Sequence, residues 1–161
     1  MMRIAPDDLC GREIRALLET HFAGMLANSP EGSCHFLDFE GLNAADVTFW
    51  SIWDDDKLAG CGALRELNGQ HGEIKSMRTS ADHLGKGVGA AMLAHIIAEA
   101  QRRGYHRLSL ETGRGDSFVP AFRLYARAGF TECTPFADYK PDPFSLFMTR
   151  RLCLDTHARA G

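Results

Sequence analysis

The sequence predicts an α+β fold, a mixed α/β domain built on one twisted sheet, and three observations lead to that prediction. Residues 46–79 contain three β-rich segments joined by short turns, which is typical of antiparallel hairpins. A strand pattern at 107–112 follows a long helical pattern, which places a parallel βαβ crossover at the centre of the sheet. Helical periodicity occurs both before and after the hairpins, so we expect helices on both faces of the sheet.

Each expected element has a recognisable pattern and boundary. The first helical pattern carries apolar side chains at helical spacing, and the turn residues 29–33 end it. The cationic turn before Gly104 ends a second helix, and Asp116 or Ser117 is expected to cap a third, which Gly129 closes. The expected helices are residues 11–28, 87–103 and 117–128, and the expected strands are residues 46–53, 58–67, 73–79, 107–112, 130–133 and 144–152.

Length and composition indicate one folded domain. The chain has 161 residues, of which 45% are hydrophobic and 24% are charged, and no repeat or linker divides it. We therefore expect a single domain over residues 1–152 and a frayed tail over residues 153–161. The net charge of −3 argues against a general nucleic-acid binder. If the chain self-associates, a homodimer is the commonest arrangement.

The cysteines and the N-terminal segment indicate a reducing compartment. The five cysteines include no CxxC pair, and their spacing fits no zinc site. Residues 1–8 lack the apolar core of a signal peptide, and the longest apolar run, residues 88–98, is too short to span a membrane. We expect a cytoplasmic protein with reduced thiols, no bound metal and no membrane contact.

The most informative stretch is Leu84–Ala90, which places three glycines at alternate positions directly before an apolar helix. A glycine turn that leads into a helix presents backbone N–H groups and the positive end of the helix dipole, and this arrangement binds phosphates. A P-loop is excluded, because Gly87 stands where that motif needs Ser or Thr. The stretch also matches the dinucleotide pattern G-x-G-x-x-G/A, with Glu111 about where a ribose-binding acid would lie. An NAD(P)-dependent oxidoreductase is therefore an alternative, although residues 80–84 separate the strand from the first glycine.

Residues 73–152 resemble the GNAT superfamily of acyl-CoA-dependent N-acetyltransferases in three motifs. The loop Leu84–Gly89 is similar to the family pattern R/Q-x-x-G-x-G/A, which opens the helix after the fourth strand. Tyr125 lies near the end of the next helix, ahead of a Gly129-Phe130 step, and Glu73 stands early in the fourth strand. The resemblance implies a GNAT-like fold and direct transfer of an acetyl group from acetyl-CoA to the amine of a small-molecule or amino-acid-like acceptor.

The resemblance also implies which residues bind acetyl-CoA as the co-substrate. Leu84 stands where the family pattern carries Arg or Gln, so one side-chain contact is lost, and Lys86 or His83 is a candidate to replace it. The backbone N–H groups of the loop are expected to hold the pyrophosphate without that side chain. The implied acetyl-CoA-binding residues are Met77, Arg78, Thr79, Leu84, Gly85, Lys86, Gly87, Val88, Gly89, Ala90, Ser117 and Phe118.

Three residues would carry the implied chemistry. Glu73 is the candidate general base for the amine, whose pKa is about 10.4 if it resembles lysine. The Met77 N–H is the candidate donor to the oxyanion, and the Tyr125 phenol is the candidate acid that protonates the departing thiolate. Structural roles are the alternatives, because Glu73 can pair with Lys75 on the same strand face and Tyr125 can pack against neighbouring phenylalanines.

The loop before the last strand is the candidate for acceptor recognition. It is unusually polar and aromatic, and its Asp138 and Tyr139 offer a charge and a hydrogen-bonding ring. The expected partner is a small-molecule amine. A non-catalytic acyl-CoA-binding sensor of the same fold is a second alternative, which the departure at Leu84 favours.

Overall fold

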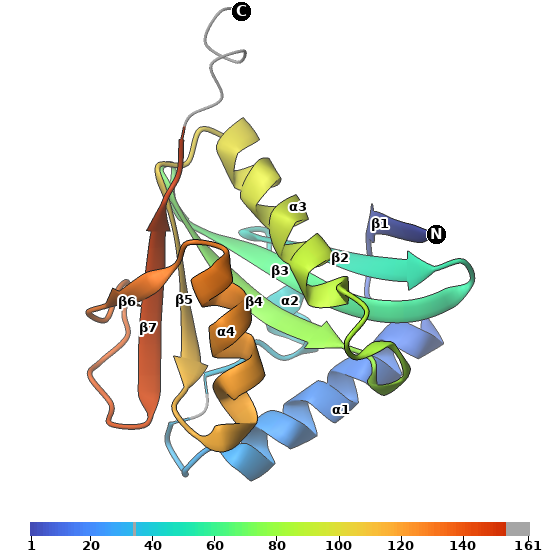
Figure 1. Ribbon diagram of the computed structural model, residues 1–161, viewed down its shortest axis with the longest axis horizontal. Coiled ribbons are helices and arrows are strands. Elements are labelled where there is room, and N and C mark those ends of the chain that lie inside the picture. Colours follow the sequence, from blue (N-terminus) through green and yellow to red (C-terminus); the bar gives the residue numbers. More distant parts are fainter. Residues whose placement is uncertain (34, 154–161) are drawn as a thin grey trace, which may run out of the picture.

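The computed structural model of the chain describes residues 1–33 and 35–153 and contains one seven-stranded sheet with helices on both faces (Figure 1). The strands are β1 (Met2–Pro6), β2 (Val47–Asp54), β3 (Lys57–Asn68), β4 (His71–Thr79), β5 (Arg107–Gly113), β6 (Thr131–Cys133) and β7 (Ser145–Arg151). The helices are α1 (Arg12–Asn28), α2 (Phe39–Leu42), α3 (Val88–Arg102) and α4 (Val119–Arg127), with short 3-10 turns η1 (Ala81–His83) and η2 (Asp116–Phe118). The order across the sheet is β1-β2-β3-β4-β5-β7-β6.

The α+β prediction is confirmed, and all the expected helices and strands are present within a few residues of their predicted bounds. The structure adds β1, α2 and the two 3-10 turns. The short edge strand β1 pairs with β2, and the single-turn α2 is capped by Asp38, whose side chain accepts a hydrogen bond from the Gly41 N–H at 2.9 Å. Elements this short do not complete enough turns or alternations to give a periodic signal in the sequence. Tertiary contacts, rather than intrinsic propensity, stabilise them.

The start of α4 differs from the prediction. Residues 116–118 form η2, so the helix begins at Val119 with Phe118 as its N-cap residue, and the predicted cap by Asp116 or Ser117 is wrong. Pro120 lies in the first turn, where its missing N–H costs no helical hydrogen bond. Apart from Cys153, the predicted frayed tail lies outside the described residues, and the single-domain boundary stays a prediction.

The central strands β4 and β5 run parallel and then separate. Their pairing covers only three positions and ends at Glu73 opposite Ser109. All the other strand pairs are antiparallel. Figure 1 shows the C-terminal ends of β4 and β5 diverging, with α4 on one side of the gap. The sheet is therefore open at its centre on the side where strand β4 leads into the glycine loop.

A bulge in β4 lies at the start of this gap. Arg78 pairs with Cys61 and Lys75 with Ala63, so two residues of β4 face one residue of β3. Ser76 has a φ of 56°, in the left-handed region that a non-glycine residue rarely adopts. Bulges of this kind re-aim side chains and interrupt the ladder. The bulge therefore changes the direction in which the backbone N–H and C=O groups of Ser76 and Met77 point, compared with a regular strand.

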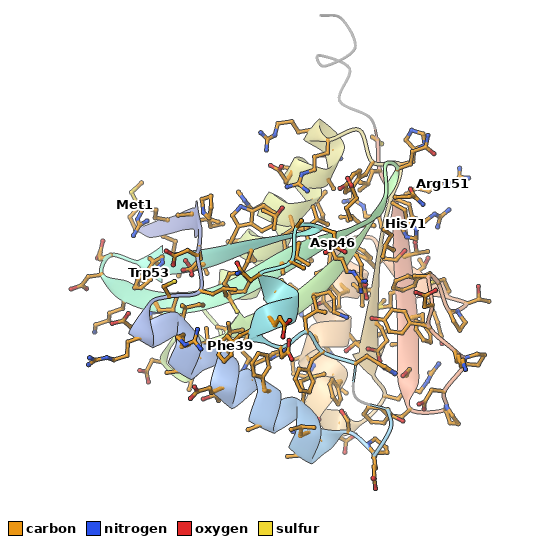
Figure 2. The ribbon with its side chains drawn as sticks, turned by 180° about the vertical axis from the view of Figure 1, so that it is seen from behind. Met1, Phe39, Asp46, Trp53, His71 and Arg151 are labelled. Atoms are coloured by element: carbon orange, nitrogen blue, oxygen red, sulfur yellow. The ribbon has the colours of Figure 1, made fainter. Side chains whose placement is uncertain are left out.

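The sheet carries a hydrophobic core on each face. The larger core lies under α3 and α4 and includes Leu64, Ile96 and Leu110, all with at most 1% of their surface exposed. The second lies under α1 and α2 and includes Ile14 and Leu18. Figure 2 shows this second face, with α1 crossing the sheet and Phe39 marking α2. Within the described residues, no helix has the length and apolar character needed to cross a membrane.

We predict that Gly60→Ala destabilises the fold. A Cβ at Gly60 would lie 2.6 Å from the Arg78 carbonyl oxygen and 2.9 Å from Val88 Cγ1, so β3 would push on β4 and on the start of α3. Overpacking of this kind costs about 1–3 kcal/mol, measurable by urea unfolding. The control is Gly69→Ala in the β3–β4 turn, where a new Cβ meets no atom within 4 Å. Equal unfolding midpoints for the two variants would contradict the prediction.

Candidate active site

The loop after β4, the first turn of α3 and one side of α4 enclose a cavity of about 680 Å³. Gly85 and Gly87 have φ values of 75° and 81°, and Gly87 is the N-cap residue of α3. A Cβ on either glycine would meet no atom within 4 Å. Glycine is therefore required here for the backbone conformation rather than for packing. An open glycine loop at the positive end of a helix is the arrangement that the predicted phosphate site requires.

Most of the residues predicted to bind acetyl-CoA line this cavity; Lys86 and Phe118 do not. Leu84 lies at its rim with 67% of its surface exposed. His83 also lines the cavity, with its Nδ1 2.8 Å from Ser80 Oγ and its Nε2 3.4 Å from Asp54 Oδ2. Of the two candidates to replace the missing Arg or Gln side chain, His83 therefore lines the cavity and Lys86 does not.

A second cavity, of about 190 Å³, occupies the gap between β4 and β5. Side chains of α1, residues 35–36 and α4 complete its walls. It shares five lining residues with the cavity at the glycine loop, which are Met77, Arg78, Ser117, Ala121 and Tyr125. A ligand in one cavity can therefore meet a ligand in the other at the bulge of β4.

Tyr125 lies at the junction of the two cavities. The ring is 6% exposed and packs edge-on against Phe130, with 5.9 Å between the ring centroids. Burial raises the pKa of the Tyr125 phenol well above its ordinary value, so the group stays protonated at neutral pH. The predicted structural and chemical roles of Tyr125 are thus compatible, because the residue is part of the core and also lines both cavities.

Glu73 lies at the end of the β4–β5 pairing, beside the gap rather than in it. Its Oε2 accepts a hydrogen bond of 2.5 Å from the Tyr139 hydroxyl and lies 3.4 Å from Lys75 Nζ. Lys75 Nζ also donates to the Tyr139 hydroxyl at 2.8 Å. Glu73 is 1% exposed and lines a third cavity of about 820 Å³, on the other side of Lys75. The expected pair of Glu73 with Lys75 is present, but it is buried rather than on the surface.

Glu111 is the carboxylate that lines the gap, and the sequence interpretation assigned it only to the dinucleotide alternative. Its Oε2 lies 3.6 Å from His35 Nδ1, and its side chain is 6% exposed. Burial raises the Glu111 pKa, against the opposing effects of hydrogen bonding to Ser145 and of the His35 and Lys75 charges. The available signal was the alternation of β5, which turns Leu110 into the core and Glu111 to the opposite face beside the crossover.

The two residues predicted for acceptor recognition lie in the third cavity. Tyr139 contacts Glu73 and Lys75, whereas Asp138 is exposed. This cavity and the gap share His35, Phe36 and Lys75. The two spaces are therefore neighbours, divided by the Lys75 side chain. In the described part of the chain no group of three or more His, Cys, Asp or Glu side chains is placed to hold a metal ion.

Comparison with known proteins gives consistent matches. The model of the acetyltransferase (GNAT) family matches residues 13–130. The chain is 56% identical to Uncharacterized N-acetyltransferase YsnE of Bacillus subtilis (strain 168), over 94% of this chain and 100% of that protein. A structure from Klebsiella pneumoniae that bears the name of an acyl-CoA N-acyltransferase has a TM-score of 0.77 and 29% identity, covering 95% of this chain and 99% of that one. A GNAT family acetyltransferase from Elizabethkingia anophelis, solved with acetyl-CoA bound, has a TM-score of 0.65 and 18% identity. The match covers 94% of this chain and 98% of that one.

These matches decide between the alternatives for the glycine pattern. A dinucleotide-binding domain needs several βα repeats, but β4 and β5 form the single parallel pair of the described sheet. The family match spans most of the chain, and the named relative is an N-acetyltransferase over its full length. The predicted resemblance and activity are confirmed, and the oxidoreductase alternative is not favoured. The chain belongs to the GNAT family of acetyltransferases, and it is an N-acetyltransferase.

Proposed function

We propose that the chain transfers an acetyl group from acetyl-CoA to the amine of a small, amino-acid-like acceptor. The observation that carries the proposal is the junction of two cavities at Met77 and Tyr125, one ending in an anion-binding loop and the other lined by a carboxylate. The coenzyme enters along α3 and α4, and the acceptor enters through the gap between β4 and β5. The structure of the Elizabethkingia protein, which holds acetyl-CoA, supports this choice of acetyl donor.

The loop before α3 would bind the pyrophosphate of acetyl-CoA. Backbone N–H groups at Gly85–Gly89 and the dipole of α3 supply the positive potential that two phosphates need. Gly89 lies within the first turn, where a Cβ would be 3.2 Å from Leu124 Cδ2. Glycine at that position thus allows α4 to lie close to the cradle. Thr79 and Ser117 line the same cavity toward the junction.

The bulge in β4 would stabilise the oxyanion. The acceptor nitrogen attacks the carbonyl carbon of the thioester, and negative charge collects on the carbonyl oxygen. A fixed backbone N–H lowers the free energy of that intermediate without reorganising. Met77 is the residue whose backbone the bulge re-aims at the junction of the cavities. Its side chain is anchored in the core near Gly62, so the backbone position is held from the other face.

Glu111 is better placed than Glu73 to act as the base, and we propose it for that role. It lines the gap with Tyr125 and Met77, whereas Glu73 is held by Tyr139 and Lys75 in the neighbouring cavity. The ammonium group of the acceptor loses a proton to Glu111 and becomes the nucleophile. A carboxylate with a raised pKa is a stronger base than an exposed one, which suits this step.

Tyr125 would complete the reaction as the acid. When the C–N bond has formed, the C–S bond breaks and the electron pair leaves with sulfur. The Tyr125 phenol, kept protonated by burial, transfers its proton to that thiolate and CoA leaves as the thiol. The Tyr125 phenolate regains its proton from the new amide nitrogen, which must lose one after the attack, and Glu111 releases its proton to bulk water. The products are the acetylated amine, free CoA and one proton.

We predict that Tyr125→Phe lowers kcat about 10²-fold, because proton transfer to the thiolate is lost. Phenylalanine preserves the edge-on contact with Phe130, so the melting temperature should change little. Release of the CoA thiol with an amine panel measures the rate. The matched control is Tyr105→Phe, a buried tyrosine whose hydroxyl donates to Glu66 Oε1 at 2.7 Å and lines neither cavity of the junction. An unchanged kcat in Tyr125→Phe would overturn the assignment, and no thiol release from the unmodified chain would favour a non-catalytic sensor.

We predict that Glu111→Gln lowers kcat/KM about 10²-fold or more and removes the acid limb of its pH profile. The carboxylate must be deprotonated to act, and burial raises its pKa, so activity of the unmodified chain should fall as pH drops through a value above the ordinary 4.3 or so of glutamate. Glu73→Gln is measured alongside, with unfolding curves for both variants. Loss of the acid limb in Glu73→Gln and its survival in Glu111→Gln would return the role to Glu73.

We predict that Leu84→Arg tightens the binding of acetyl-CoA. The side chain lies exposed at the rim of the cradle, where a guanidinium can reach a phosphate. An exposed ion pair contributes about 0.2–1 kcal/mol, so calorimetry should show a Kd lowered up to about fivefold. Leu26→Arg is the control, because Leu26 is 61% exposed on α1 and lines neither cavity of the junction. Equal Kd values in the two variants would contradict the placement of the pyrophosphate at this loop, as would binding of NADH without binding of acetyl-CoA.

A further inference from the structure

We propose that Arg78 selects acceptors that carry a carboxylate next to the amine, so that the natural acceptor is an α-amino acid or a zwitterion of similar size. This inference rests on the proposed function, because it concerns the acceptor side of the same site. Two side chains of opposite charge, Arg78 and Glu111, line the small cavity of the gap.

Arg78 provides the cationic end. Met77 packs into the core under α3, so the next residue along β4 turns its side chain to the opposite face, toward α1. A Cβ built on Gly24 of α1 would lie 3.5 Å from Arg78 Nη1. Within residues 1–33 and 35–153, none of the ion pairs involves Arg78. A half-buried guanidinium with no carboxylate partner favours an anionic ligand, since its fork of N–H donors matches a carboxylate.

Two buried polar groups lie in the same cavity as Arg78. His21 Nδ1 and Ser76 Oγ are buried, and neither has a hydrogen-bond partner among the described residues. His21 is 7% exposed, and burial together with the Arg78 charge lowers its pKa to about 4, so the imidazole is neutral at pH 7. A neutral imidazole N–H and a hydroxyl can both donate to a carboxylate. These unpartnered groups therefore favour a polar ligand at this end rather than an apolar one.

Glu111 provides the anionic end. Its Oε2 lies 3.6 Å from His35 Nδ1, whereas the Arg78 guanidinium lies against Gly24 of α1, and both side chains line the cavity of the gap. Lys75 is already engaged by Glu73 and Tyr139, so it does not compete for the acceptor carboxylate. An acceptor amine at Glu111 and an acceptor carboxylate at Arg78 would span the cavity from β5 to α1.

The size of the cavity limits the acceptor. Its volume of about 190 Å³ is below the roughly 300 Å³ at which pockets for drug-sized ligands begin. A single amino acid is therefore a better match than a peptide or an aminoglycoside-sized molecule. A side chain on the acceptor could extend past Lys75 toward the third cavity, which shares lining residues with the gap.

The first test compares each amino acid with the amine that lacks its carboxylate. Purified full-length chain is assayed with alanine and ethylamine, leucine and isoamylamine, and phenylalanine and phenethylamine, and CoA release is followed. At least one amino acid should exceed its paired amine by tenfold or more in kcat/KM, since a charged hydrogen bond contributes about 1.5–3 kcal/mol. Equal or better rates with the amines would overturn the inference and leave the proposed function in place. Binding of acetyl-CoA without transfer to any compound of the panel would also overturn it, and no acetyl-CoA binding would overturn both.

The second test changes the guanidinium. Arg78→Met should raise KM for the preferred amino acid at least tenfold more than it raises KM for the paired amine. Because Arg78 also lines the coenzyme cavity, the Kd of acetyl-CoA is measured in the same variant, and both acceptors are compared at saturating acetyl-CoA. The KM of Arg78→Lys for the preferred amino acid should lie between the values for the unmodified chain and Arg78→Met. A single ammonium keeps the positive charge but lacks the paired N–H donors of the guanidinium. The control is Arg123→Met, an exposed arginine of α4 that lines neither cavity of the junction. Equal losses with amino acid and amine would assign Arg78 to the coenzyme alone and overturn the inference.

Discussion

The separation of β4 from β5 is the constraint on which the rest of the structure depends. Parallel pairing stops at Glu73 and Ser109, and beyond that point the backbone groups of the two strands no longer satisfy one another. A continuous ladder would fill this space with hydrogen bonds and leave no room for a ligand. The bulge at Ser76 and the helices α1 and α4 stabilise the opening from three sides. The reaction site is thus an interruption of the sheet rather than a feature added to its surface.

The charged side chains in and beside the gap fall into two groups, a buried ion pair and two side chains that line the gap. Glu73 and Lys75 neutralise one another under the Tyr139 hydroxyl, and this buried pair forms the partition between two cavities. Removing one member of such a pair is costly, because the other charge is left buried without a partner. Glu111 and Arg78 lack that compensation from each other. Glu111 lies 3.6 Å from His35 Nδ1, and none of the ion pairs among the described residues involves Arg78. Under the proposed acceptor site, both side chains would attract a group of opposite charge, and partial burial strengthens that attraction.

The sequence was sufficient for what depends on short-range patterns. Periodicity located the long helices and the strands, and the glycine pattern located the left-handed turn at Gly85 and Gly87 that leads into α3, since that turn is set by local backbone conformation. It was insufficient where two distant segments meet. Glu73 and Glu111 both follow the strand pattern, and only the end of the β4–β5 pairing determines which carboxylate enters the gap. His21 illustrates the same limit, because a histidine on an amphipathic helix gives no sign that Arg78 lies opposite.

The two halves of the site differ in how they respond to pH. At the proposed cradle the groups that would bind the anion are backbone N–H groups and a helix dipole, which do not titrate, and Leu84 at the rim carries no ionisable group. On the acceptor side, the Glu111 carboxyl has a raised pKa and the amine itself must lose a proton. Under the proposed roles, pH would therefore act on the acceptor through Glu111 and the amine, and not on the backbone contacts that would hold the pyrophosphate. The burial that raises the Glu111 pKa would then affect proton transfer without altering those contacts.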